Sequence, residues 1–161
     1  MDLKQAENIM IEVLSKTWNI KGKEVNLLNK GWRFTGFDRS VKRAGVCIGG
    51  RKEISLSRLL TENHSDDTVK NTILHEASHA VDNVIRGYSD HSREWKEVAR
   101  AMGCDGERCY SEVPEAVKAL TYKYEAFCPT HGSIGGWTRR PKAGQRRCGK
   151  CKSIITIKQN F

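Results

Sequence analysis

Three residues near the middle of the chain have the types and spacing of a catalytic metal site. The pentapeptide His75-Glu76-Ala77-Ser78-His79 places two histidines four residues apart. On a helix, residues four apart lie one above the other on the same face, so both imidazoles can bind a single zinc ion. Glu76 lies about 100° around that helix, where its carboxylate can act as general base toward a metal-bound water. The pattern therefore predicts one catalytic zinc ion and metal-assisted hydrolysis.

The helix predicted over residues 66–86 favours this interpretation over two chance histidines on an exposed helix. Ser65 or Asp66 can cap its start, and Gly87 can end it in a left-handed conformation. Its apolar residues recur at helical spacing on one wide face, namely Val69, Ile73, Ala77, Ala80 and Val84, with Leu74, Val81 and Ile85 beside them. Because the histidine face adjoins this apolar face, we expect the site at the edge of a core, where a cleft can form.

A catalytic zinc ion usually takes three protein ligands and leaves one position open. His91 is the preferred third ligand, because it stands at the start of a second helix predicted over residues 92–102. The residues that follow it at spacings of four, three and four are Trp95, Val98 and Met102. Glu94 and Glu97, on the same helix, are alternative ligands. His64 lies in a polar loop and is expected to face solvent.

A second set of metal ligands lies near the end of the chain. Cys128 and His131 form one pair, Cys148 and Cys151 form another, and sixteen residues separate the pairs. Two pairs of this spacing can close a tetrahedral structural zinc site. A segment of about 40 residues buries little apolar surface, so the metal must contribute much of its folding free energy. We therefore expect a structural zinc ion in addition to the catalytic one.

The remaining cysteines are expected to be ordinary thiols. Cys47 falls inside a predicted strand and is interpreted as an inert core thiol. Cys104 and Cys109 are five residues apart but have no further ligands beside them. No oxyanion-stabilising residue stands out: Tyr88 and Tyr110 are candidates only because they lie near the motif in sequence, and we expect both to pack.

The positive charge is concentrated at the C-terminal end. The chain carries a formal net charge of +9, and residues 122–161 hold nine basic side chains against one acidic one. The candidate nucleic-acid-binding residues between the two ligand pairs are Trp137, Arg139, Arg140, Lys142, Arg146 and Arg147. Arginines can hold phosphates and stack on bases, and an aromatic side chain among them suits single-stranded or distorted DNA. A solvated hairpin with counterions is the alternative.

The rest of the pattern indicates an α+β fold. Residues 3–18 form an amphipathic pattern that Asp2 and Gln5 can cap. Short apolar runs at 32–37, 44–48 and 54–56 predict three strands in a small antiparallel sheet. A further helix is predicted to begin at Pro114 and to include Val117 and Leu120. We expect two domains, a core at residues 1–121 and a basic module at residues 122–161.

Size and hydropathy restrict the class of protein. No run approaches the roughly 18 apolar residues that a membrane span needs. The first residues lack the apolar stretch of a signal peptide, so the protein is expected to stay in the cytoplasm, associated with nucleic acid. Six cysteines in such a compartment favour metal binding over disulfides. We expect a monomer that acts on a protein substrate.

These motifs resemble the SprT-like (Spartan-type) metallopeptidase family. The resemblance rests on His75-Glu76-x-x-His79, the following His91 with Trp95, and the upstream strand at 54–57, and it extends from about Trp32 to Ile157. It implies a minimal zincin fold of a few helices and a small sheet whose edge can receive an extended substrate, often followed by a zinc ribbon. It also implies His75, His79 and His91 as zinc ligands and Glu76 as catalytic base. Ribbons of the family commonly carry four cysteines, whereas this chain has His131 at the second position.

Three functional hypotheses follow. The first is a zinc endopeptidase that degrades proteins bound or crosslinked to DNA, an activity known for the Spartan branch of the family. The second is a nucleic-acid-binding zinc-ribbon regulator or adaptor with an inactive or structural zincin body. The third is a peptidase with an unrelated protein substrate, in which the basic tail serves only for localisation. Glu76 favours an enzyme, because a structural zinc site has no need of a base.

Overall fold

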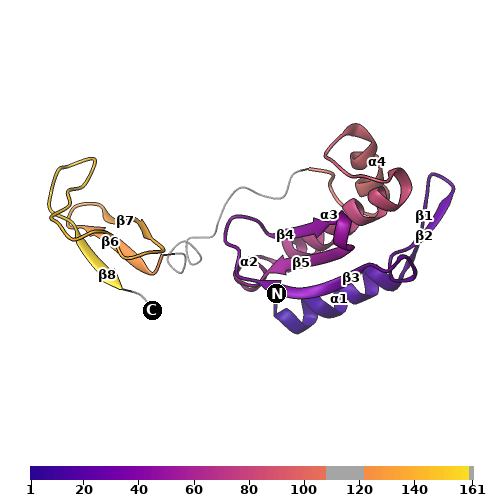
Figure 1. Ribbon diagram of the computed structural model, residues 1–161, viewed down its shortest axis with the longest axis horizontal. Coiled ribbons are helices and arrows are strands. Elements are labelled where there is room, and N and C mark those ends of the chain that lie inside the picture. Colours follow the sequence, from indigo (N-terminus) through magenta and orange to yellow (C-terminus); the bar gives the residue numbers. More distant parts are fainter. Residues whose placement is uncertain (108–121, 160–161) are drawn as a thin grey trace. The chain divides into compact units, whose positions relative to one another are not determined.

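The computed structural model describes residues 1–107 and 122–159. The chain divides into two compact units, Met1–Glu112 and Val113–Phe161 (Figure 1). The predicted boundary between residues 121 and 122 stays a prediction, because residue 121 is not among the described residues. Cys109, Tyr110 and the helix predicted to begin at Pro114 also lie outside them. Each helix in the described ranges is too short or too polar to cross a membrane.

The first unit combines helices with two small sheets. Its elements are α1 (Leu3–Ser15), β1 (Thr17–Ile20), β2 (Lys23–Asn26), η1 (Leu28–Lys30), β3 (Arg33–Asp38), β4 (Gly45–Ile48), η2 (Gly49–Arg51), β5 (Glu53–Ser57), α2 (Arg58–Asn63), α3 (Asp66–Arg86) and α4 (Arg93–Ala101). One sheet is the hairpin β1-β2, and the other has the order β3-β5-β4. The expected mixture of helices and short strands is confirmed.

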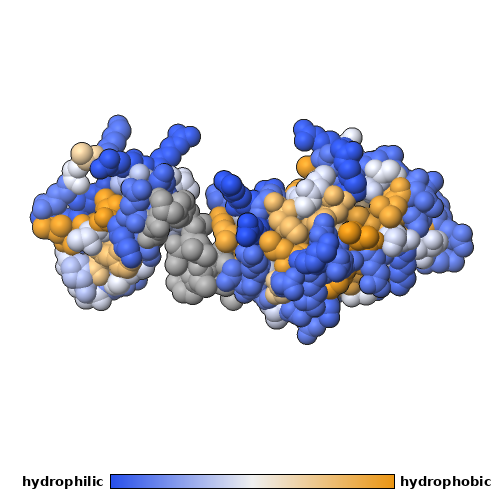
Figure 2. Space-filling model, turned by 90° about the horizontal axis from the view of Figure 1, so that it is seen from below, coloured by the Kyte–Doolittle hydropathy of each residue, from blue (hydrophilic) through white to orange (hydrophobic). Residues whose placement is uncertain are grey.

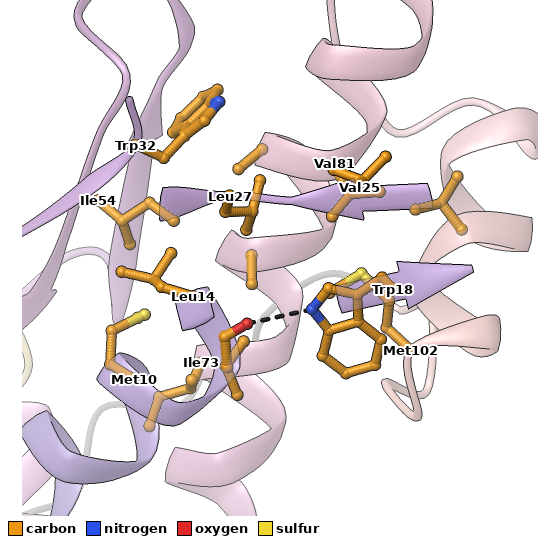
Figure 3. Close-up of a cluster of buried hydrophobic side chains, with 14 of the residues drawn as sticks. Met10, Leu14, Trp18, Val25, Leu27, Trp32, Ile54, Ile73, Val81 and Met102 are labelled. Carbon is orange, nitrogen blue, oxygen red and sulfur yellow. Dashed lines mark hydrogen bonds between the residues drawn. The ribbon is translucent and has the colours of Figure 1, made fainter. Parts of the chain in front are cut away.

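Helix α1 begins as predicted but ends earlier. Asp2 caps it by accepting a hydrogen bond from the Gln5 backbone N–H at 2.9 Å. The helix ends at Ser15 rather than at residue 18, because Trp18 belongs to β1. The indole of Trp18 turns back and donates to the Val13 carbonyl at 3.1 Å (Figure 3). The hairpin that follows turns at Lys21, which adopts a positive φ.

The three strands predicted between residues 32 and 57 are present, but the prediction of an antiparallel sheet is wrong for one of them. β4 pairs antiparallel with β5, whereas β3 pairs parallel with it. The loop between β3 and β4 passes the end of β5, so β5 lies between the other two strands. Ile54 and Leu56 of this central strand are fully buried. Alternating apolar residues locate strands without specifying their order, which explains the error.

Helix α3 is the central element of the first unit, and its predicted bounds are confirmed. Ser65 caps its start by accepting from the Thr68 N–H, and Gly87 ends it with a φ of 86°. It packs against α1, α4 and β4. Figure 3 shows Met10 and Leu14 of α1 next to Ile73 of α3 within the buried cluster. Because this core covers one side of α3, the helix holds its polar motif in a fixed place.

The second unit is a three-stranded antiparallel sheet. Its strands are β6 (Tyr124–Cys128), β7 (Gly132–Trp137) and β8 (Thr156–Gln159), in the order β7-β6-β8. An isolated bridge between Arg147 and Ile154 adds a second turn. Its buried apolar residues among those described are Ala126, Cys128 and Cys148. In the view of Figure 2, hydrophilic residues cover much of the surface of both units. So small an apolar core agrees with a fold that needs another source of stability.

Candidate metal centres and basic surface

The three histidines of the motif face one another in the first unit. The Nε2 atom of His79 lies 3.3 Å from that of His75 and 3.2 Å from that of His91, and the third side of the triangle is 3.2 Å. In a tetrahedral site with Zn–N bonds of about 2.0–2.1 Å, ligand nitrogens are about 3.3 Å apart. The triangle therefore has the dimensions that a zinc ion requires, and the donor atoms suit it.

Two elements and the link between them bring these side chains together. His75 and His79 lie one turn apart on α3, as predicted, while His91 lies in the segment that joins α3 to α4. Trp95 of α4 is fully buried and contacts all three imidazoles, with its ring stacked on His79 at 4.7 Å. The indole thus forms an apolar support beneath the cluster.

The alternative ligands do not join this group. In the part of the chain that the structure describes, the cluster of potential ligands contains the three histidines and neither glutamate. Glu97 instead pairs with Lys21 at 2.7 Å and with Arg93, and Glu94 is exposed. His64 is half-buried rather than solvent-facing, and it lies outside the cluster.

A hydrogen bond orients the ring of His79 so that its Nε2 atom is directed at the other two imidazoles. The Nδ1 atom of His79 lies 2.8 Å from the Ser89 hydroxyl. Burial lowers the pKa of His75 to about 4, although the Glu107 backbone and the Asp105 carboxylate oppose the shift. Burial, together with the neighbouring His75 and His91, lowers the pKa of His79 to about 3. Both imidazoles are therefore neutral at pH 7, the form that binds a metal.

Glu76 is buried beside this triangle, with 6% of its surface exposed. Burial raises the pKa of its carboxyl to about 8, while the Arg43 charge and a hydrogen bond from the Cys47 backbone act in the opposite direction. A carboxyl group with a pKa near the working pH is suited to accept and return a proton. A bound cation would favour its ionised form.

A cleft of about 640 Å³ opens onto the histidines and Glu76. Its walls come from β4 with the loop before it, from α3, and from the segment that carries His91. The lining residues are Lys42, Arg43, Ala44, Gly45, Val46, Cys47, Gly49, His75, Glu76, His79, Asn83, Ser89, Asp90 and His91. β4 is an edge strand, since within the described residues it pairs on one side only, with β5.

Several cleft residues were missed or misplaced by sequence reasoning. Cys47 packs on the core but also lines the cleft, where burial and the Glu76 charge raise the pKa of its thiol well above its usual range. Arg43 and Ser89 lie in loops without a recognisable motif. Tyr88 is exposed, with the Arg86 guanidinium over its ring at 4.5 Å, and does not line the cleft.

The second unit brings its four predicted ligands together. The Sγ atom of Cys128 lies 3.4 Å from that of Cys151 and 3.5 Å from Nδ1 of His131, and Cys148 Sγ lies 3.6 Å from the same nitrogen. Sulfur and nitrogen ligands of a tetrahedral zinc ion are about 3.6 Å apart. Hydrogen bonds with Ser153 lower the pKa of Cys151 to about 5, which favours the thiolate that binds metal.

The predicted nucleic-acid-binding residues lie on the same small unit. The guanidinium of Arg146 stands over the Trp137 ring at 5.1 Å. Arg147 donates to the Lys152 carbonyl at 3.2 Å, which fixes its side chain near the second ligand pair. Arg139, Arg140 and Lys142 are exposed. The Trp137–Arg146 pair offers a stacking surface with a positive charge.

Comparison with known proteins defines the class. The SprT-like family model matches residues 13–118, so this chain belongs to the SprT-like family. It is 29% identical over 145 residues to the human germ cell nuclear acidic protein, a match that covers 81% of this chain and 20% of that protein. It is 28% identical over 127 residues to Protein SprT of Glaesserella parasuis serovar 5 (strain SH0165), covering 73% of this chain and 78% of that protein.

The extent of these matches matters for function. This chain spans only about a fifth of the length of the human relative. No solved structure has significant similarity to the chain. The comparisons therefore define a family domain, and an activity has to be argued from the residues of the two candidate metal centres.

Proposed function

We propose that this chain is a zinc-dependent endopeptidase with a minimal zincin core, and that it acts on proteins bound or crosslinked to DNA. His75, His79 and His91 hold the catalytic zinc ion, and Glu76 is the catalytic base. The observation that carries the proposal is the triangle of Nε2 atoms at 3.2–3.3 Å, with a buried carboxyl group in the same cleft. A site that was only structural would need neither the open cleft nor the carboxyl.

The zinc ion, when bound, supplies Lewis acidity and lowers the pKa of a water ligand towards about 7. The chain's own residues provide the rest of the chemistry. Glu76 accepts a proton on its carboxylate oxygen from the attacking water and returns that proton to the leaving amine. Trp95 and the Ser89 hydroxyl keep the imidazoles in place while this happens. The reaction is hydrolysis of a peptide bond.

The edge strand β4 supports a polypeptide substrate. Its outer edge borders the cleft that contains Glu76 and the histidines, where the Cys47 N–H donates to the Glu76 carboxyl. An extended peptide can add to such an edge through main-chain hydrogen bonds, which bind the backbone whatever the side chains. A scissile bond in that peptide would lie beside the metal-binding face of α3.

The second unit supports a substrate located on DNA. We propose that Cys128, His131, Cys148 and Cys151 hold a structural zinc ion in a ribbon. The ribbon presents Trp137 and Arg146 with the neighbouring basic residues to single-stranded or distorted DNA. Its role is to bring the peptidase core to proteins on the nucleic acid, the substrate class that the family resemblance implies.

Cleavage of a protein crosslinked to DNA tests the proposal. The wild-type chain and Glu76→Gln are compared on this substrate and on the same protein free of DNA, in zinc. We expect the wild type to cleave the crosslinked protein faster than the free one, and Glu76→Gln to lose cleavage while still binding DNA. Equal cleavage by both chains would refute the mechanism. A wild type that binds DNA without cleaving anything would favour the adaptor function.

A further inference from the structure

The short segment between α3 and α4 carries three consecutive residues, at positions 89–91, that contact either the three-histidine site or a residue that holds the segment in place. Ser89 contacts Nδ1 of His79 at 2.8 Å. Asp90 accepts a hydrogen bond from Arg86 at 2.9 Å. His91 directs its Nε2 atom to the other two imidazoles at 3.2 Å. A shift of this segment would therefore move one ligand and the hydrogen-bond partner of another at once.

Arg86 holds this segment from the last turn of α3. Its guanidinium forms two parallel bonds to the carboxylate of Asp82, at 2.7 and 2.5 Å, and Asp82 is only 1% exposed. The same Nη2 group reaches Asp90, and Nη1 donates to the Tyr88 hydroxyl at 3.2 Å. A buried, bidentate anchor leaves the guanidinium one orientation, in which its remaining N–H groups face the segment.

Asp90 passes the restraint on to α4. Its Oδ1 atom, which accepts from Arg86, also accepts from the backbone N–H of Ser92 at 3.1 Å. Ser92 directly precedes α4, whose Trp95 supports the three imidazoles. Hydrogen bonds thus connect Asp82, Arg86, Asp90 and Ser92, and they tie the segment that carries His91 to α3 and to the start of α4.

We infer that Arg86, acting through Asp90, is a positioning residue that fixes His91 and Ser89 for metal binding. The inference rests on the proposed function, since it needs a metal at the three histidines. Hydrogen-bonded groups behind metal ligands commonly contribute 10–100-fold to metal affinity. Lysine cannot replace arginine here, because it lacks the planar fork that bonds Asp82 and Asp90 together.

Asp90→Ala is the informative variant, because it leaves the buried Asp82–Arg86 pair intact. The side chain of Asp90 is 51% exposed, so its removal should cost little stability. Arg86→Lys and the variant that carries both substitutions complete a double-mutant cycle. Arg58→Ala is the matched control, because Arg58 forms a comparable i,i+4 pair with Glu62 on α2 and does not line the cleft.

The readouts are metal affinity, by competition with a chelator, and the absorption spectrum of the Co²⁺-loaded full chain. Both Co²⁺ sites absorb in the visible, and only the cysteine site adds thiolate-to-metal charge transfer in the near ultraviolet. A difference spectrum between the wild type and a variant cancels the bands of the unchanged cysteine site and leaves the change at the histidine site. We expect Asp90→Ala and Arg86→Lys each to weaken metal binding at the histidines about tenfold or more and to alter those visible bands. The double variant should bind metal no more weakly than the weaker-binding of the two single variants, because both changes break the same contact between Arg86 and Asp90.

Two outcomes separate the inference from the function beneath it. If the wild type binds metal at the histidines and Asp90→Ala binds it equally well with the same spectrum, the positioning role is refuted while the proposed function stands. If the wild type itself binds no metal there, the proposed function fails and the inference with it. The melting temperature of the metal-free Asp90→Ala chain should stay near that of the wild type, which excludes general unfolding as the cause of an affinity loss.

Discussion

Gly45 of β4 lies directly against the side chain of Glu76 on α3. A Cβ atom at position 45 would be 2.7 Å from Cγ of Glu76 and 3.0 Å from its Oε1. Real Cβ contacts are essentially never under 3.0 Å. Glycine at this position therefore lets the edge strand approach the helix, with the carboxyl of Glu76 against the strand in the cleft that the histidines also line.

Gly45→Ala should inactivate the proposed peptidase without removing its metal. The added methyl group must displace the Glu76 carboxyl, and a misplacement of about 1 Å at a catalytic group can cost about 100-fold in rate. We expect the cleavage rate to fall by about that factor while zinc content is unchanged. Gly50→Ala is the control, since no heavy atom lies within 4 Å of a Cβ there. Equal activity of the two variants would contradict the close fit of Gly45 and Glu76.

Glu76→Gln should stabilise the metal-free chain, and more so at high pH. The folded chain keeps the Glu76 proton up to a pKa of about 8, whereas the unfolded chain loses it near 4.5. The folded state thus binds more protons between these values, and its stability falls as the pH rises through them. Glutamine cannot ionise and avoids this loss, which should amount to a few kcal/mol at pH 8.

Urea unfolding in a chelator at pH 5 and pH 8 measures this difference. The control is Glu62→Gln, a change at an exposed position of α2, which should have the same small effect at both pH values. A gain from Glu76→Gln that is equal at pH 5 and pH 8 would show that the buried carboxyl is ionised in the folded chain.

Cys148→Ser should remove one metal ion and unfold the second unit alone. Cys148 is 1% exposed and belongs to the four-ligand group, and few other buried groups among the described residues support that unit. We expect two zinc ions per wild-type chain and one in the variant, by elemental analysis. Cys104→Ser is the control, because Cys104 is buried in the first unit outside both ligand groups. Loss of both ions from Cys148→Ser would contradict independent sites.

DNA binding should depend steeply on salt and on the pair formed by Trp137 and Arg146. If the protein neutralises about five phosphates, a plot of the logarithm of the binding constant against the logarithm of the salt concentration should have a slope near −4.5 on duplex DNA. Arg146→Ala should make this slope less steep by about 0.9. Trp137→Ala should weaken binding to single strands more than to duplex, because stacking needs unpaired bases. Lys4→Ala, on α1 of the first unit, is the control. The binding constants are measured by fluorescence anisotropy. A slope near zero would contradict DNA binding by the basic residues and would leave solubility as their role.

The candidate sites could be predicted from sequence because their signals are local. Two histidines at i and i+4 on a capped, amphipathic helix specify their own geometry, as do the two ligand pairs of the second unit. His91 can be predicted from the need for a third ligand and from its place just before the helix that becomes α4. For the same reason the bounds of α3 were correct, since Ser65 and Gly87 mark both ends.

The contacts that could not be predicted join residues through space without a pattern in sequence. One signal in the sequence was missed, because the β1-β2 hairpin turns at Lys21 and Gly22, both with a positive φ, and glycine is the usual residue of such a turn. Nothing about Ser89 or Asp90 as isolated polar residues indicates that one orients His79 and the other holds Arg86. The close approach of Gly45 to Glu76 depends on β4 lying at the edge of the sheet, and strand order is not encoded in apolar alternation.

The position of zinc in a crystal of the zinc-loaded chain tests the central claim most directly. Anomalous diffraction at the zinc absorption edge should give one peak about 2.0–2.1 Å from the Nε2 atoms of His75, His79 and His91. A second peak at the cysteine group would confirm that zinc is present in the crystal. A peak at the cysteines with none among the three imidazoles would contradict the assignment of a catalytic metal.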